Sequence, residues 1–95
     1  MDLLDNEKIG EIVYSKSGRD KDNIFLIVGV LDENYAYISD GKLRKIDKPK
    51  KKKVKHLDFT GKVAYEFREK MLNGEMISNS KIRIYLNSED ANKEV

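Results

Sequence analysis

The positive charge of this chain is concentrated in one segment. Between residues 42 and 55 there are nine basic residues and a single acid, Asp47. The segment carries +8, and because the whole chain carries only +2, all the other residues together carry −6. Such an asymmetry is the electrostatic footprint of a protein that binds a polyanion, and nucleic acid is the first candidate. The nine residues are Lys42, Arg44, Lys45, Lys48, Lys50, Lys51, Lys52, Lys53 and Lys55.

Contacts with phosphate groups are the chemistry that this segment suits best. Each phosphate that a lysine or arginine neutralises releases condensed counterions, so affinity falls with salt with a slope of about −0.7 to −0.9 per contact. Asp47 alone cannot offset the charge by ion pairing within the segment. The alternative is that lysines keep an exposed edge strand from pairing with other chains. Protection of an edge needs only about one or two lysines, whereas the run here has four in succession.

A second group of cations precedes the most apolar segment of the chain. Its members are Lys16, Arg19 and Lys21. They surround Gly18, whose missing side chain would let a phosphate approach the backbone amides. The alternative is a solvated turn in which Arg19 and Lys21 pair with the two aspartates of the same segment. Both interpretations are open at this point.

The sequence contains few candidates for catalytic or metal-binding residues. The carboxylates are numerous but scattered over turns and the C-terminal tail, and no phosphate-binding glycine loop, nucleophile elbow or metal-ligand spacing is present. Without cysteine there is no thiolate nucleophile, disulfide or cysteine-based zinc site. His56 is the only histidine, so we interpret it as a phosphate or packing contact. We expect no enzymatic activity, metal, cofactor or small-molecule substrate.

Length and hydropathy restrict the class of protein. Ninety-five residues make one domain, near the small end of independent stability. The longest apolar run, residues 24–31, is eight residues and contains Gly29, far short of the ~18 to 20 residues of a membrane span. The N-terminus is acidic where a secretory signal is basic. These features predict a cytoplasmic protein without a membrane partner.

The first two thirds of the chain predicts short strands. Residues 9–16, 23–31 and 35–39 are rich in β-branched and aromatic side chains, and the second of these runs suits a central strand buried on both faces. Asp40-Gly41 predicts a type I′ hairpin that would pair Ile38 with Leu43 and Tyr37 with Arg44. Pro49 marks an edge or a connection. Leu43, Ile46, Val54 and Leu57 would anchor two further strands, giving a small, strongly bent, five-stranded antiparallel barrel.

The predicted hairpin leaves two interpretations of the tyrosines in residues 35–39. Tyr37 opposite Arg44 could form a stacking platform for an unpaired base, with Tyr35 beside it. Val30 can fall on the same face, however, and Tyr37 is then a core residue. We favour the core.

The last third predicts helices. Val63, Phe67 and Met71 recur every four residues and predict a helix over residues 61–73, capped by Asp58 or Thr60 and ended by Gly74. Residues 81–87 fit a strand or a helix, and a capping Asn79 or Ser80 favours the helix. The final residues, 88–95, lack apolar content and are expected to fray.

The segment from residue 9 to residue 57 resembles a KOW-type domain. The resemblance is carried by SKSGRDKD with the following VGV, and by SDGKLRKIDKPKKKKVKHL. It is strongest to the archaeal and eukaryotic large-subunit ribosomal protein family called "fourteen-e" and its bacterial KOW-domain relatives. The resemblance implies an SH3-like barrel that binds structured RNA, commonly ribosomal RNA. One departure is Asp22, which stands where KOW sequences usually have glycine, although aspartate tolerates the left-handed region better than most residues.

These observations predict a mainly-β protein in which an N-terminal tail (residues 1–8) precedes an SH3-like barrel (9–57) and a C-terminal helical extension (58–95). The expected function is RNA binding in translation, as a ribosomal or ribosome-associated protein. The expected partners are ribosomal RNA and ribosomal proteins. His56 and all twelve cations named above are the predicted RNA contacts. The alternative is a protein-interaction adaptor whose lysines serve solubility or steering.

Overall fold

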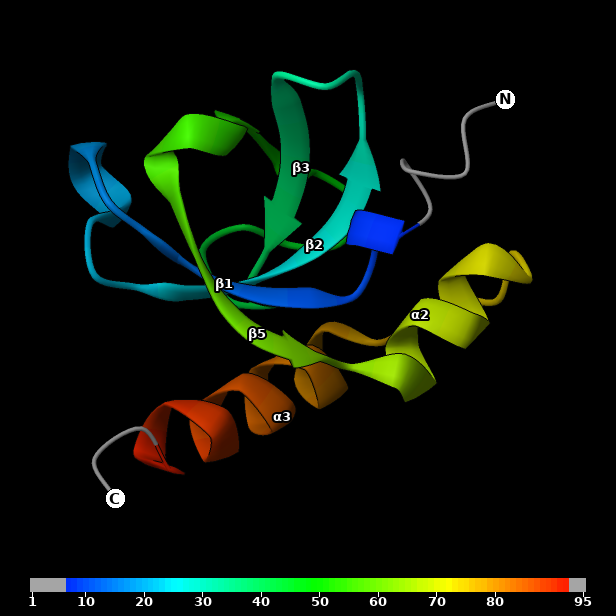
Figure 1. Ribbon diagram of the computed structural model, residues 1–95. Helices are drawn as coiled ribbons and strands as arrows, with labels where there is room; N and C mark the ends of the chain where they lie inside the picture. The colour runs from blue at the N-terminus through cyan, green and yellow to red at the C-terminus, as the bar shows by residue number, and fades with distance from the viewer. Residues whose placement is uncertain (1–6, 93–95) are drawn as a thin grey trace.

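The computed structural model describes residues 7–92 of the chain. It is a small, mainly-β fold with one five-stranded antiparallel sheet, in the order β4-β3-β2-β1-β5, followed by two helices (Figure 1). Short 3-10 turns, η1 and η2, follow β1 and β4. The elements are β1 (Glu11–Ser15), η1 (Gly18–Asp20), β2 (Ile24–Val30), β3 (Tyr35–Ser39), β4 (Lys50–Lys53), η2 (Val54–His56), β5 (Leu57–Val63), α2 (Tyr65–Leu72) and α3 (Asn79–Asn92).

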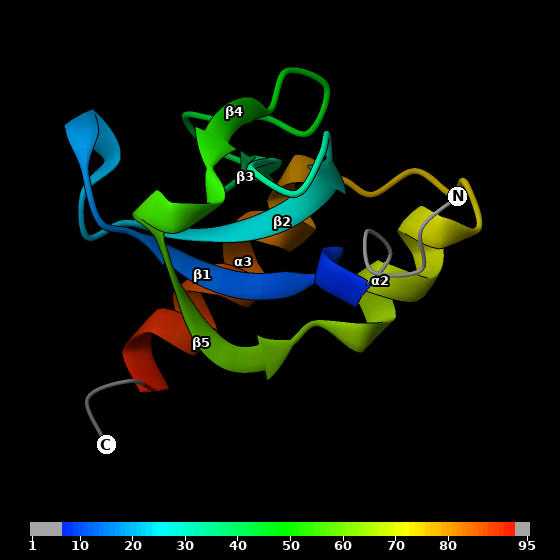
Figure 2. The same cartoon turned by 45° about the horizontal axis from the view of Figure 1, so that its top comes forward.

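The sheet is curved, with β4 and β5 as its two edges (Figure 2). No ladder joins these two strands within residues 7–92, so the sheet is not closed into a barrel. β5 pairs with β1 as far as Val63, so the sheet extends past residue 57, where we expected it to end. Pro49 directly precedes the edge strand β4, as predicted.

Both faces of the sheet are buried, as predicted for the second strand. Because successive side chains of a strand point to opposite faces, Ile12 and Leu26 face the helices while Val13, Phe25 and Ile27 face the other side. The cluster on the helical side adds Ala64, Phe67, Ile77, Ile82 and Leu86. The cluster on the opposite side adds Ala36, Ile38 and Leu57.

The first helix begins later than predicted. Residues 58–63 belong to β5, and the Thr60 hydroxyl donates to the Ile12 carbonyl at 2.9 Å, so neither Asp58 nor Thr60 caps a helix. Pairing with β1 therefore outweighs the helical spacing of Val63. The predicted end is confirmed, because Gly74 has a φ of +77° just after α2.

The second helix is confirmed and is longer than predicted. The Ser78 hydroxyl accepts the Lys81 N–H, in place of a cap by Asn79 or Ser80. The helix continues through residues 88–92, where we expected fraying. Two contacts hold this end: Tyr14 Oη donates to Asp90 Oδ1 at 2.8 Å, and Lys62 pairs with Glu89 at 3.3 Å. Residues 93–95 and 1–6 lie outside the described part. None of the helices within it is long and apolar enough to cross a membrane.

The predicted hairpin at Asp40-Gly41 is wrong. A type I′ turn needs positive φ at both central residues, but only Gly41 has it. The Asp40 carboxylate instead accepts the N–H groups of Lys42 and Arg44, both at 2.9 Å, and so stabilises a loop. β3 consequently pairs with residues 50–53, and Leu43 is 70% exposed where we expected a strand anchor.

Candidate nucleic-acid interface

Strand geometry divides the lysine run of β4 into two pairs. Directly opposed residues of antiparallel strands share a face, and successive residues alternate between faces. Tyr35 and Tyr37 oppose Lys53 and Lys51, so these four side chains share one face of the sheet, which we call the outer face. Ala36 and Ile38 oppose Lys52 and Lys50. This second lysine pair therefore belongs to the other face, which carries the Ala36 and Ile38 cluster and which we call the inner face.

The inner pair, Lys50 and Lys52, ties β4 to the η1 turn. Lys50 Nζ lies 2.7 Å from Asp20 Oδ2, and Lys52 Nζ donates to the Ser17 carbonyl at 2.9 Å. Arg44 also reaches Asp20 Oδ2, at 3.3 Å. Three of the nine cations in residues 42–55 are therefore engaged within the molecule, which sequence reasoning missed because their partners lie in the earlier turn.

The buried Asp20 carboxylate is held ionised by these contacts. Burial favours its neutral form, but the hydrogen bonds and charges of Lys50 and Arg44 outweigh that effect and hold the pKa of Asp20 below its ordinary 3.8. Burial, assisted by the charges of Lys50 and Arg44, lowers the pKa of Lys52 although Asp20 opposes this. Asp20 thus acts as the anchor of the turn.

The outer pair, Lys51 and Lys53, faces solvent. Lys51 Nζ lies 5.2 Å from the centroid of the Tyr35 ring, a cation–π distance. The exposed Lys55 of η2 follows β4 directly. The Lys16 N–H donates to the His56 carbonyl at 2.8 Å, which places the end of β1 beside η2. We call the exposed set Lys16, Lys51, Lys53 and Lys55 the lysine face.

His56 lies near three members of the lysine face and near the inner Lys52. Desolvation and neighbouring positive charge both lower the pKa of His56. The lysines responsible come from β4, from η2 and from the residue that follows β1. They are Lys55, Lys52, Lys53 and Lys16, in decreasing order of effect. The structure therefore brings Lys16 near cations that lie 36 to 39 residues later in the chain.

The backbone of the η1 turn and of the residues that follow it includes two positive φ angles. Gly18 has a φ of +76°, and Asp22 has a φ of +72°, so aspartate does occupy the left-handed region here. Arg19 and Lys21 are exposed and form no ion pair within the described residues, because Asp20 pairs with Arg44 and Lys50 instead. The two cations of the turn are therefore available to a ligand.

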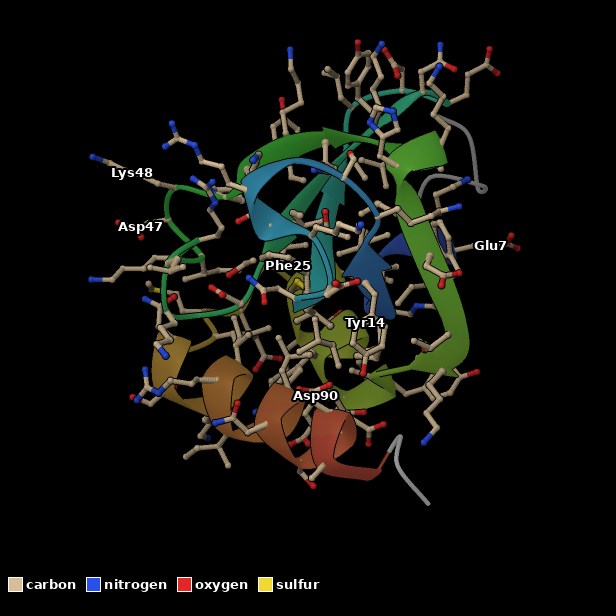
Figure 3. All side chains as sticks on the ribbon, turned by 90° about the vertical axis from the view of Figure 1, so that its left-hand side faces the viewer. Glu7, Tyr14, Phe25, Asp47, Lys48 and Asp90 are labelled. Atoms are coloured by element: carbon tan, nitrogen blue, oxygen red, sulfur yellow. The ribbon has the colours of Figure 1, made fainter. Side chains whose placement is uncertain are left out.

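The remaining predicted cations lie on the loop between β3 and β4. Lys42, Lys45 and Lys48 are exposed there. Figure 3 shows Lys48 and Asp47 projecting outward from this loop. Gly41 holds the loop close to α3, since a Cβ at this position would lie 2.3 Å from the Asn79 carbonyl oxygen.

The two tyrosines of β3 differ in surroundings. Tyr37 is half-buried and packs over Gly29, whose missing side chain leaves room for the ring, and it opposes Lys51 in place of Arg44. Tyr35 lies under Lys51 and also lines a shallow hollow. The hollow is lined by Glu33, Asn34, Tyr35, Lys53, Val54 and Lys55. Sequence reasoning missed it because its walls come from two separate segments.

Comparison with known proteins adds no relative. No family model matches the chain, and none of the curated proteins compared with it is a match. The KOW resemblance therefore rests on the residues quoted above.

Proposed function

We propose that this chain is a non-catalytic protein of translation, ribosomal or ribosome-associated, that binds structured RNA through the lysine face and the η1 turn. The observation that carries the proposal is the state of the four lysines in that face. None of them forms an ion pair within residues 7–92, whereas the two inner lysines of β4, Lys50 and Lys52, are both engaged. Unneutralised cations gathered on one surface favour a polyanionic ligand.

The sheet supports an SH3-like barrel of the KOW type as the scaffold. β1 pairs with both β2 and β5, which brings the first and last strands side by side as such a barrel requires. The Gly18 and Asp22 conformations support the KOW resemblance of the first loop. The Asp20–Lys50 pair joins η1 to β4, and the bond from the Lys16 N–H to the His56 carbonyl joins the end of β1 to η2.

Phosphate contacts dominate the proposed binding. Four lysines, each neutralising one phosphate, would give a salt slope of about −3. Because A-form RNA helices are recognised mainly through their shape and their backbone, such a face distinguishes the spacing of phosphates more than the sequence of bases. Arg19 and Lys21 extend the surface across the η1 turn.

Cosedimentation with ribosomal subunits across a salt series tests the cellular part of this proposal. We expect the protein to sediment with subunits at low salt and to dissociate steeply as salt rises. An adaptor that docks on an apolar groove would stay bound with little dependence on salt. A protein that remains in the supernatant at every salt concentration would contradict a ribosomal role.

A further inference from the structure

The hollow beside Tyr35 has a rigid frame. It lies where the turn between β2 and β3 meets η2, and the Val54 N–H donates to the Asn34 carbonyl across this junction at 2.8 Å. Asp32 Oδ1 accepts the N–H groups of Asn34 and Tyr35 at 2.8 and 2.9 Å. Backbone bonds therefore fix both walls, so the site does not depend on a flexible loop closing.

The lining combines the groups that a nucleotide needs. Tyr35 and Val54 supply aromatic and aliphatic surface, while Lys53 and Lys55 supply positive charge at the same hollow. Its volume of about 410 Å³ is near the lower end of the ~300–1,000 Å³ of small-ligand pockets. A paired base is stacked inside its helix and cannot enter, whereas an unpaired base can be splayed out onto an aromatic ring.

We propose that this hollow binds a single unpaired nucleotide of the RNA, with its base against Tyr35 and its phosphate at Lys53 and Lys55. This inference rests on the proposed RNA binding and adds a position at which the RNA must be unpaired. Lys51 supports the site by lying over the Tyr35 ring, which restrains the ring and adds a cation beside the base.

Glu33, which also lines the hollow, bears on which base it would prefer. The Glu33 carboxylate is an acceptor only and repels phosphate, so a base with donors suits it. Guanine offers two adjacent N–H donors on its Watson–Crick edge, at N1 and N2, which one carboxylate can accept together. Uracil offers a single donor between two carbonyl oxygens. The site therefore favours an unpaired guanine over an unpaired uracil.

Three RNAs test the proposal: a blunt duplex, the same duplex with one bulged guanine, and the same duplex with one bulged uracil. We expect the parent protein to bind the guanine bulge about 5- to 150-fold more tightly than the blunt duplex, the equivalent of ~1–3 kcal/mol for one stacked base. Tyr35→Leu should remove this difference and leave duplex binding unchanged, whereas Tyr35→Phe should keep it. Tyr65→Leu is the matched control, because Tyr65 is an exposed tyrosine of α2 with Arg68 over its ring at 5.4 Å.

Glu33→Gln provides a test that does not threaten the fold, since Glu33 is exposed. It should reduce the preference for guanine over uracil. Because it also removes a carboxylate that repels phosphate, any change in duplex binding should be a tightening shared by all three RNAs. Equal binding of all three RNAs by the parent protein would overturn the nucleotide site while leaving RNA binding intact. Failure to bind any of the three at low salt would overturn both proposals. A preference for the bulge that survives in Tyr35→Leu would also refute the site described here.

Discussion

Removing the outer lysines of β4 should weaken RNA binding, whereas removing the inner lysines should lower stability, although the two changes are chemically identical. The first variant is Lys51→Ala/Lys53→Ala, and the second is Lys50→Ala/Lys52→Ala. Each removes two positive charges from the same four-residue strand. We expect the two variants to differ because successive side chains of β4 point to opposite faces of the sheet. The comparison therefore tests the assignment of the two faces directly.

The magnitudes follow from the contacts. Loss of two phosphate contacts in the outer variant should reduce the size of the salt slope by about 1.4 to 1.8, while the melting temperature stays nearly constant because exposed charges contribute little to stability. The inner variant removes a 2.7 Å ion pair with buried Asp20 and the bond to the Ser17 carbonyl. We expect it to lose ~1–3 kcal/mol of stability, which lowers the melting temperature by roughly 4–8 °C per kcal/mol in a domain of this size.

Filter binding at several salt concentrations, with a thermal melt of each variant, separates these outcomes. Lys62→Ala/Lys70→Ala is the charge-matched control, because Lys62 of β5 pairs with Glu89 of α3 and Lys70 pairs with Glu66 within α2, away from the lysine face. It should change neither the slope nor the stability appreciably. If the inner and outer variants behave alike in both measurements, the assignment of the faces is wrong.

Three further changes test the scaffold of the site. Gly18→Val should cost ~1–3 kcal/mol, because a β-branched residue is strongly disfavoured at a φ of +76°; an unchanged urea midpoint would show that the turn is misplaced. Since the pKa of Asp20 lies below 3.8, the stability it contributes is fully present above that pH and is lost as pH falls through the lower folded value. Asp20→Asn should therefore be less stable than the parent protein at neutral pH but converge with it in acid, and parallel curves in melts from roughly pH 2 to 7 would contradict this linkage. Leu86→Ala should lose ~2–5 kcal/mol, because Leu86 is 2% exposed between α3 and the sheet, yet it should keep the parent salt slope under conditions where it is folded; a changed slope would place α3 in the RNA interface.

The parts of the fold that were predictable are those with local causes. Residues 24–30 form a buried strand because nearly every side chain is apolar, and Gly74 has the left-handed conformation that is common at the end of a helix. The register of β3 was not predictable from the Asp40-Gly41 pair, because the Asp40 carboxylate bonds to its own loop. β4 consists only of lysines, so its existence depends on pairing with β3 and has no apolar signal of its own.

The candidate site shows the same division. The cationic segment was predictable, because basic and acidic residues can be counted along the chain. Such a count does not distinguish Lys51 from Lys52, because that difference arises only when the strand has a register and a buried Asp20 to face. The hollow forms where Tyr35 and Val54 lie side by side. The backbone bond between Asn34 and Val54 that holds them there is a tertiary contact, which the sequence alone does not predict.

The salt dependence of RNA binding by the unmodified protein tests the central claim most directly. A structured RNA with a bulged guanine is titrated by filter binding at several monovalent salt concentrations, and log K is plotted against log salt. Four phosphate contacts from Lys16, Lys51, Lys53 and Lys55 predict a linear plot with a slope of about −3. A slope near zero, or no binding at the lowest salt, would contradict the proposal that the lysine face is an RNA interface.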